Sequence, residues 1–262
     1  MIGFIGGGNM AEAMIKGIRQ SGKKDIMTSE PRAERRAYLE KTYDVKTTSD
    51  NREIAKNCNI IILAVKPQNM DDVTGEIGDY ISNDKIVVSI AAGITLSYLS
   101  SRLKTSKIIR VMPNTPALVQ EGMSVLSMCE CIHDKEMGLV RDIFMSIGKV
   151  MVLPEKYMDA VTALSGSGPA FIALFVEKMI DSGIQAGLTR YNASELAIQT
   201  LIGTAKLLES GIPPDKLREM VTSPGGTTAA GLKIFEEKGF SNIINAVIEA
   251  AANRSKELGK KE

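Results

Sequence analysis

The chain has 262 residues and a nearly neutral charge balance, with 32 Lys and Arg against 31 Asp and Glu. This balance argues against nucleic acid or an anionic membrane as a partner, because both need a strongly basic face. Three cysteines and one histidine are too few for a disulfide framework, and the odd cysteine count favours reduced thiols and a cytoplasmic location. We also expect no membrane span, since no apolar stretch approaches the ~20 residues that cross a bilayer.

Short apolar runs alternate with helical stretches over the first half of the chain. Strands are expected at 2–5, 26–28, 60–65, 86–90 and 107–112, with helices at 10–19 and 33–41 among the segments between them. The run at 60–65, IIILAV, is unbroken by polar residues and is typical of a strand buried on both faces of a parallel sheet. The alternation predicts an α/β fold with a Rossmann-type doubly wound parallel sheet.

The pattern changes after Leu153, where strand-like runs stop and apolar residues recur at helical spacing. We therefore expect a dinucleotide-binding Rossmann domain at 1–155 and an all-α domain for substrate binding and dimerisation at 156–262. Several of the expected helices are apolar over more than half of their circumference. A domain this small cannot cover them all, so we expect helix faces to pack against a second subunit.

A glycine-rich segment directly follows the first expected strand. Residues 6–11, GGGNMA, fit the pattern G-x-G-x-x-A at the start of a helix. The first glycine permits a tight turn, the third lets a pyrophosphate approach, and the helix N-terminus offers N–H groups and a positive dipole end. A tight strand–helix turn alone can also carry glycines, but the position at the first strand of the pattern favours dinucleotide binding. The predicted cofactor residues here are Gly6, Gly7, Gly8, Asn9 and Met10.

The end of the second expected strand bears on the choice of cofactor. At this place an acidic residue would hold a ribose 2′-hydroxyl, and a cationic residue would hold a 2′-phosphate. Glu30 favours NADH, whereas Arg32, Arg35 and Arg36 favour NADPH. The arginines are equally typical of an exposed helix start. The residues therefore leave the preference open.

Two more strand ends are expected to lie near the cofactor. They are the segments 64–67, with Ala64, Val65, Lys66 and Pro67, and 91–93, with Ala91, Ala92 and Gly93. Ligands of doubly wound sheets bind outside the carboxyl ends of the strands, which is where both segments fall. An ordinary turn with an exposed lysine is the alternative interpretation of the first segment.

A turn rich in glycine and hydroxyl groups lies inside the expected helical domain. Residues 222–228, TSPGGTT, precede a helical stretch at 229–237. Free N–H groups and hydroxyls at a helix N-terminus can hold a small carboxylate, although Ser and Thr also cap helices for purely structural reasons. No metal site is predicted, because His133 with the nearby Cys129 and Cys131 has too few partners for zinc. The sequence also shows no combination of nucleophile, base and acid. This favours hydride transfer between a cofactor and a substrate, which needs fewer protein acids and bases than hydrolysis does.

Taken in order, these motifs closely resemble those of the pyrroline-5-carboxylate reductases, which catalyse the last step of proline biosynthesis. The matching segments are Phe4–Met10, Leu63–Pro67, Ser89–Gly93, Arg110–Pro116, Leu164–Ala170 and Leu217–Thr228. The last of them, LREMVTSPGGTT, is the most specific. The resemblance extends over essentially the whole chain.

The resemblance implies that NAD(P)H reduces 1-pyrroline-5-carboxylate to L-proline on a homodimer with interleaved helices, which in the family often builds a ring of dimers. Implied cofactor contacts are Gly6–Met10, Glu30, Asn51, Ala64–Pro67 and Ala91–Gly93, to which we add Arg32; implied substrate contacts are Ser223, Gly225, Gly226, Thr227 and Thr228. We expect Thr228 to be catalytic, orienting the ring nitrogen and relaying a proton from water. NADPH-using relatives often carry Ser or Arg where this chain has Glu30, which again leaves the preference open.

Two other functions stay open at this point. Another imine or β-hydroxyacid reductase of the same architecture would need a catalytic lysine in the helical domain, for which Lys178 is the candidate. A non-catalytic nucleotide-sensing protein would have no use for the intact PGGTT turn, which argues against it.

Overall fold

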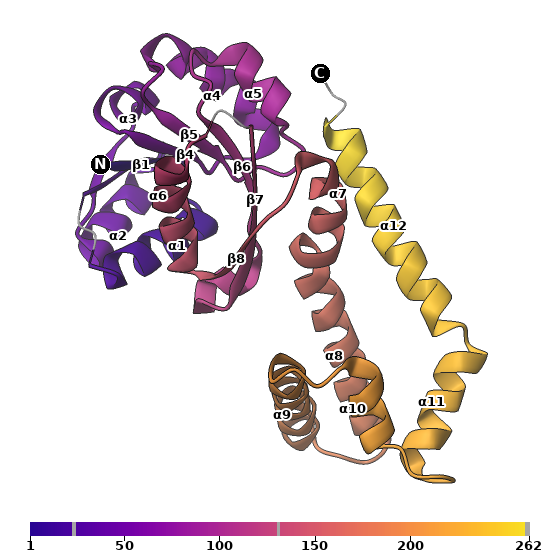
Figure 1. Cartoon of the computed structure of the whole chain (residues 1–262). Coiled ribbons are helices and arrows are strands. Elements are labelled where there is room, and N and C mark those ends of the chain that lie inside the picture. The colour runs from indigo at the N-terminus through magenta and orange to yellow at the C-terminus, as the bar shows by residue number, and fades with distance from the viewer. Residues whose placement is uncertain (23–24, 130–131, 260–262) are drawn as a thin grey trace. The chain divides into compact units, whose positions relative to one another are not determined.

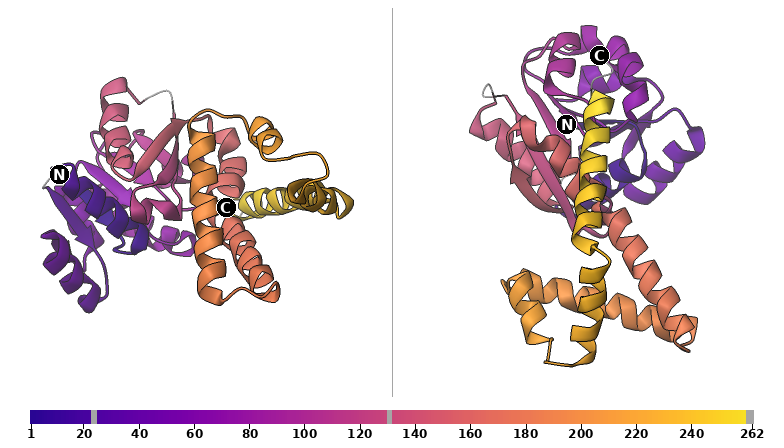
Figure 2. Two further views of the ribbon diagram at one scale, coloured as in Figure 1. Left: turned by 90° about the horizontal axis from the view of Figure 1, so that it is seen from below. Right: turned by 90° about the vertical axis from the view of Figure 1, so that its right-hand side faces the viewer.

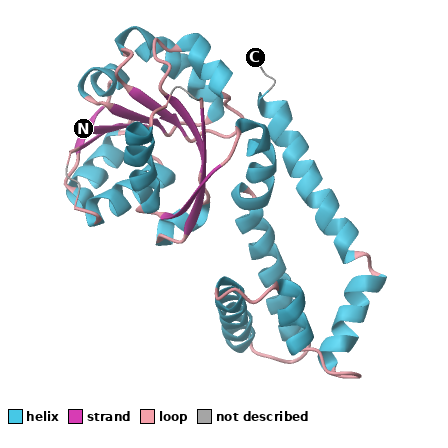
Figure 3. Cartoon of the chain, in the orientation of Figure 1, coloured by secondary structure: helices cyan, strands magenta, loops and turns pink. Residues whose placement is uncertain are grey.

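The computed structural model describes residues 1–22, 25–129 and 132–259. The chain divides into two compact units, one made of Met1–Ser167 with Ala250–Glu262 and the other of Gly168–Glu249. Every strand of the described residues lies in the first unit, and the second unit consists of helices and their connections (Figures 1 and 3).

The first unit is a sheet with helices between its strands. The strands are β1 (Ile2–Ile5), β2 (Ile26–Ser29), β3 (Lys46–Thr48), β4 (Ile60–Leu63), β5 (Ile86–Ser89), β6 (Ile108–Met112), β7 (Gly122–Met128) and β8 (Gly148–Val152). The helices are α1 (Asn9–Gln20), α2 (Ala33–Tyr43), α3 (Asn51–Asn57), α4 (Met70–Ile77), α5 (Leu96–Arg102), α6 (Asp134–Met145) and α7 (Met158–Val161), and the last turns of α12 (Phe240–Gly259) also belong to this unit.

The strand order is β3-β2-β1-β4-β5-β6-β7-β8. The strands from β3 to β6 run parallel, whereas β7 is antiparallel to β6 and β8 is parallel to β7. The predicted doubly wound parallel sheet is confirmed, with its topological switch point between β1 and β4. The sequence pattern missed β3, which has only the polar residues KTT, and the two strands β7 and β8 at the other edge.

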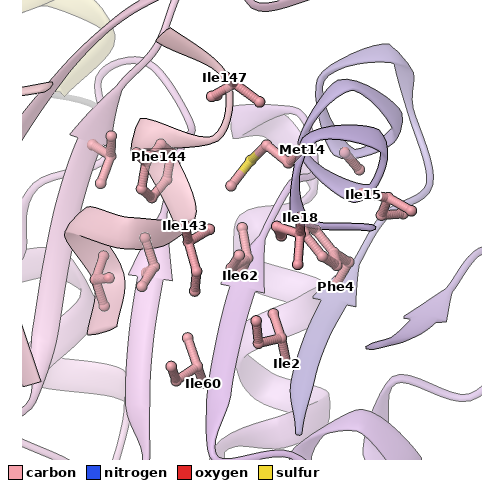
Figure 4. Close-up of a cluster of buried hydrophobic side chains, with 14 of the residues drawn as sticks. Ile2, Phe4, Met14, Ile15, Ile18, Ile60, Ile62, Ile143, Phe144 and Ile147 are labelled. Atoms are coloured by element: carbon pink, nitrogen blue, oxygen red, sulfur yellow. The ribbon is translucent and has the colours of Figure 1, made fainter. Parts of the chain in front are cut away.

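Two hydrophobic clusters cover the two faces of the sheet. In one cluster Ile2, Phe4, Ile60 and Ile62 pack against Met14 and Ile18 of α1 and against Ile143 and Phe144 of α6 (Figure 4). In the other, the alternate residues Ile5, Ile61 and Leu63 pack against side chains of α3, α4 and α5. Neighbouring residues of β1 and β4 therefore enter opposite layers, which explains why these strands carry apolar residues without interruption.

The second unit contains α8 (Gly168–Gln185), α9 (Arg190–Glu209), α10 (Pro214–Met220), α11 (Thr227–Glu237) and the first half of α12 (Figure 2). Its helices expose many large apolar side chains, among them Ile172, Phe175, Met179, Leu201, Leu208 and Ile244. The helical stretch Glu155–Gln185 contains an 18-residue window with a mean hydropathy of 1.4, long and apolar enough by length and composition to cross a membrane. The expectation that no apolar stretch approaches this length is therefore wrong.

The cysteines differ from one another. Cys58 is free, and burial raises the pKa of its thiol to about 11, which makes it unreactive. Cys129 is disulfide-bonded, so the expectation of reduced thiols is wrong for this residue. An odd number of cysteines does not by itself exclude a disulfide, so counting alone could not reveal it. Cys131 lies outside the described residues.

Candidate functional site

The predicted cofactor segments meet at the carboxyl edge of the parallel strands. The last residue of β1, Ile5, is in register with Ser29 of β2 and with Leu63 of β4, and Leu63 is in register with Ser89 of β5. The residues that follow these four strand ends therefore line one edge of the sheet. They are the glycine loop, Glu30, the segment 64–67 and the segment 91–93.

The glycine loop has one side packed and one side open. Gly6 has φ +98°, and a Cβ atom there would lie 2.7 Å from the carbonyl oxygen of Ala64, so only glycine fits. Gly8, the N-cap of α1, has φ −70°, and a Cβ atom there would meet nothing within 4 Å. No side chain caps the first turn of α1, so its N–H groups stay available to an anion in the open space at Gly8.

Charged side chains brace the loop from both sides. The N–H of Gly7 donates to Oε2 of Glu30 at 3.1 Å, and the Gly7 carbonyl oxygen accepts from Nε of Arg35 at 2.7 Å. Arg35 also pairs with Glu12 of α1 at 2.5 Å. Burial disfavours the charged form of Glu12, but hydrogen bonds from Tyr43, Arg35 and Tyr38 outweigh it and hold the pKa of this carboxyl below its usual value. The loop is thereby held in place before any ligand arrives.

Glu30 is buried at the end of β2, with only 4% of its surface exposed. Its carboxylate accepts from the Arg32 backbone N–H at 3.1 Å and from the Arg32 side chain at 2.8 Å (Nε) and 3.3 Å (Nη2), besides Gly7. Burial opposes ionisation, yet the hydrogen bonds from Arg32 and Gly7 prevail and lower the pKa of the Glu30 carboxyl. The carboxylate is therefore charged at neutral pH and held by the chain's own donors.

Asn51 lies beside this strand end as the first residue of α3. Its side chain accepts from the Ser29 hydroxyl at 2.5 Å and donates to Glu76 of α4 at 2.7 Å. Across the sheet, Lys66 is exposed after β4, and Pro67 begins a short 3₁₀ turn. After β5, the Ala91 N–H donates to the buried Ser89 hydroxyl at 3.3 Å.

The predicted substrate residues lie in the second unit. Gly225 has φ +71°, the Gly226 N–H donates to the Ser223 carbonyl oxygen at 3.0 Å, and Gly226 is the N-cap of α11. Ser223 and Thr227 are exposed and Thr228 is half-buried. Within the described ranges, neither the Ser223 nor the Thr228 hydroxyl makes a hydrogen bond, so both are available to a ligand. Cofactor and substrate residues thus belong to different compact units.

Other residues singled out by the sequence have structural partners. Lys178 is exposed and pairs with Glu177 at 2.6 Å and Asp181 at 3.2 Å; hydrogen bonds from this ammonium to the two carboxylates raise its pKa. An acid with a raised pKa suits proton delivery near neutrality poorly, which disfavours Lys178 as a catalytic lysine. His133 is the N-cap of α6, and no group of three or more His, Cys, Asp or Glu side chains able to hold a metal occurs among the described residues.

Sequence reasoning missed two contacts close to the predicted cofactor segments. The buried Arg110 of β6 pairs with Glu155 at 3.0 Å, and Glu155 also accepts from the Leu96 N–H at 2.8 Å. An arginine inside an otherwise apolar strand is the signal that could have found this pair. Gly93 has φ +80°, and a Cβ atom there would lie 3.0 Å from Cβ of Leu258, so the last turn of α12 packs on the segment 91–93. Nothing in the local sequence indicates this contact.

Known proteins similar to this chain share its whole length. Residues 155–258 match the family described as pyrroline-5-carboxylate reductase dimerisation, and residues 1–93 match the family described as NADP oxidoreductase coenzyme F420-dependent. The chain is 42% identical to a pyrroline-5-carboxylate reductase of Synechocystis, over 99% of this chain and 98% of the relative. Its fold is similar to that of the pyrroline-5-carboxylate reductase of Coxiella burnetii, with TM-score 0.92 and 35% identity over 99% of this chain and 98% of the other.

A third similar protein is the pyrroline carboxylate reductase of Plasmodium falciparum, solved with NADP bound. It has TM-score 0.89 and 34% identity to this chain, over 99% of this chain and 98% of that one. Identity at this level over the full length, with the same fold, shows the family directly. The chain belongs to the pyrroline-5-carboxylate reductase family.

Proposed function

We propose that this protein reduces 1-pyrroline-5-carboxylate to L-proline with NAD(P)H, the final step of proline biosynthesis. The observation that carries the proposal is the in-register alignment of four strand ends, which gathers the glycine loop and three further cofactor segments at one edge of the sheet. Relatives of 42% and 41% identity over almost the whole chain bear the name of this enzyme.

The fold offers a cradle that suits a dinucleotide. The pyrophosphate would lie over Gly8 at the N-terminus of α1, with Gly6, Gly7, Asn9 and Met10 around it. Glu30, Arg32 and Asn51 would face the adenosine half. The remaining cofactor contacts would come from the segment Ala64, Val65, Lys66 and Pro67 and from Ala91, Ala92 and Gly93. The open space at Gly8 supports this arrangement, because a side chain there would occupy the path of the phosphates.

The turn before α11 would hold the substrate. The N–H groups at Gly225, Gly226 and Thr227 suit the substrate carboxylate, and the Ser223 hydroxyl has no partner among the described residues. A bound NAD(P)H supplies the hydride for C5 of the ring. Thr228 orients the ring nitrogen with its hydroxyl and relays a proton from water, since a hydroxyl with a pKa far above neutrality is a poor acid by itself. The imine nitrogen gains that proton as C5 gains the hydride.

In this proposal residues 1–155 form the dinucleotide-binding domain, and residues 156–262 form the domain that binds substrate and dimerises. The match of residues 155–258 to the dimerisation family supports this division. We propose a homodimer, with a ring of dimers as the larger assembly, because the helices of the second unit expose large apolar side chains that a second copy would cover. A cytoplasmic location fits an enzyme that consumes NAD(P)H.

The test is substrate-dependent oxidation of each cofactor. The purified protein should consume NADPH, NADH or both when 1-pyrroline-5-carboxylate is added, and it should do so equally well in EDTA. Absorbance at 340 nm that stays constant with both cofactors would disprove the assignment. A second imine substrate without a carboxylate is the control, because it cannot use the turn before α11 and should react far more slowly.

A further inference from the structure

The end of β2 holds an acid and two cations whose contacts bear on the choice between NADH and NADPH. A ribose 2′-hydroxyl needs an acceptor with free lone pairs. The Glu30 side chain is 5% exposed, and its two oxygens already accept four N–H groups from Gly7 and Arg32. Because a carboxylate accommodates about four hydrogen bonds, a ribose hydroxyl would have to displace the chain's own donors.

Arg32 and Arg36, at the same place, have N–H donors that make no hydrogen bond within the described residues. The Arg32 side chain is 68% exposed and uses only Nε and one Nη2 N–H for Glu30, so the rest of its guanidinium can bind an anion. Arg36 donates through Nη1 to the carbonyl oxygens of Glu30 at 2.7 Å and Pro31 at 2.8 Å. No carboxylate in the described part of the chain forms an ion pair with Arg36, so its guanidinium is held by backbone carbonyl oxygens alone.

Arg35, the third arginine of this segment, differs from both. Its guanidinium already pairs with the Glu12 carboxylate and donates to the Gly7 carbonyl oxygen. Glu12 and Glu30 thus pair with Arg35 and Arg32, whereas Arg36 donates only to backbone carbonyl oxygens and keeps its charge available beside the place where a 2′-substituent of the cofactor would lie.

We propose that this chain prefers NADPH to NADH, that Arg32 and Arg36 receive the 2′-phosphate, and that Glu30 is a positioning residue for Arg32 and the glycine loop rather than a ribose acceptor. The inference rests on the proposed function in one respect, namely that this strand end binds the adenosine half of the cofactor. Arginine pairs strongly with phosphate, and an arginine that is already held in place loses less side-chain freedom on binding.

The test uses adenosine 2′,5′-bisphosphate and AMP as probes, with calorimetry on the purified full-length protein. These nucleotides differ only at the 2′ position and need no substrate, so the result does not depend on whether the protein reduces 1-pyrroline-5-carboxylate. The wild type should bind the bisphosphate at least tenfold more tightly than AMP. Arg32→Ala should remove most of this difference and change AMP binding less than about twofold, and Arg36→Ala should act in the same direction.

Glu30 is tested by Glu30→Gln, alone and combined with Arg32→Ala. Glutamine keeps a side-chain oxygen that can accept from the Gly7 N–H and hold the glycine loop, so AMP binding should stay nearly unchanged. Bisphosphate binding should weaken about threefold or more, and this effect should vanish in the Arg32→Ala background. A ribose acceptor would behave in the opposite way, with weaker AMP binding and stronger bisphosphate binding. Glu34→Gln is the matched control, because it removes the same charge from an exposed side chain in the first turn of α2, four residues after Glu30. Equal affinity of the wild type for both nucleotides, or a ribose-acceptor pattern in Glu30→Gln, overturns the inference.

Discussion

Gly8→Ala separates the binding role of the glycine loop from its structural role. Gly8 has φ −70°, which alanine adopts freely, and the added methyl group would meet nothing within 4 Å. Alanine at a compatible position stabilises a protein by about 0.4–1 kcal/mol, because the unfolded chain loses freedom. The melting temperature of Gly8→Ala should therefore stay constant or rise slightly.

Cofactor binding should respond in the opposite direction. The methyl group would occupy the space through which a pyrophosphate approaches the N–H groups of α1, and a hydrogen bond to a charged group contributes about 1.5–3 kcal/mol. Loss of one such bond raises the dissociation constant for NADPH roughly tenfold to a hundredfold, since 1.4 kcal/mol corresponds to a factor of ten. Fluorescence titration of NADPH measures the constant, and differential scanning calorimetry measures the melting temperature.

Two other glycines provide the controls. Gly75 is exposed in α4 with open space at its Cβ position, so Gly75→Ala should leave both stability and NADPH binding intact or slightly improved. Gly6→Ala should destabilise the fold by about 2 kcal/mol or more, because φ is +98° and the new atom lies 2.7 Å from the Ala64 carbonyl oxygen. A Gly8→Ala protein that binds NADPH as tightly as the wild type would refute the placement of the pyrophosphate.

Three further predictions address the chemistry, the assembly and the pH response. Thr228→Ala should lower kcat at least about tenfold while NADPH binding stays constant, and Thr228→Ser should recover much of the rate; full kcat in the alanine variant across pH would show that solvent alone protonates the ring. Sedimentation at micromolar concentration should show a dimer or a larger species, and an active 28.3 kDa monomer would contradict this expectation. The pKa of the Glu12 carboxyl is lowered in the folded state, so its contribution to stability is present above the unfolded value near 4.5 and is lost as pH falls through the folded value. The melting temperature should accordingly drop more steeply below about pH 4.5 in the wild type than in Glu12→Gln.

The α/β layers could be predicted because the central strands are predominantly apolar. Ile60–Leu63 shows this most clearly, since alternate side chains enter clusters on opposite faces. The edge strands β3 and β8 were not predicted, because their residues are only partly buried and need not be apolar. Lys46–Thr48 is half exposed and polar, and Gly148–Val152 leaves Met151 and Val152 exposed. These two segments therefore show neither a continuous apolar run nor a regular alternation of apolar and polar residues, the two patterns that identify a strand.

The sequence pattern predicted that the cofactor segments follow strand ends, and the register of the strands brings these segments to one edge of the sheet. The strand–turn–helix pattern predicts a role for Gly6 and Gly8, and in the structure a side chain at Gly6 would clash with the Ala64 carbonyl oxygen, whereas the space at Gly8 is open. The residue type at Glu30 does not reveal its partners, because the hydrogen bond from the Gly7 N–H joins residues 23 positions apart in the chain. The packing of Leu258 on Gly93 joins residues far apart in the chain, which single-sequence patterns do not encode.

The apolar helical stretch Glu155–Gln185 shows why composition alone does not choose a partner. By length and hydropathy it could cross a membrane, and only 11% of its most apolar window is buried in the chain. Glu177 and Asp181, however, lie about half a turn away from the face of Ile172 and Met179, given 3.6 residues per turn, and Lys178, which pairs with both, lies about a third of a turn away. A membrane would have to desolvate this ion-paired group, at a cost of several kcal/mol, whereas a second copy of the chain could cover the apolar face and leave the charges in water. The arrangement of charge around the helix therefore favours self-association, in agreement with the dimerisation family that residues 155–258 match.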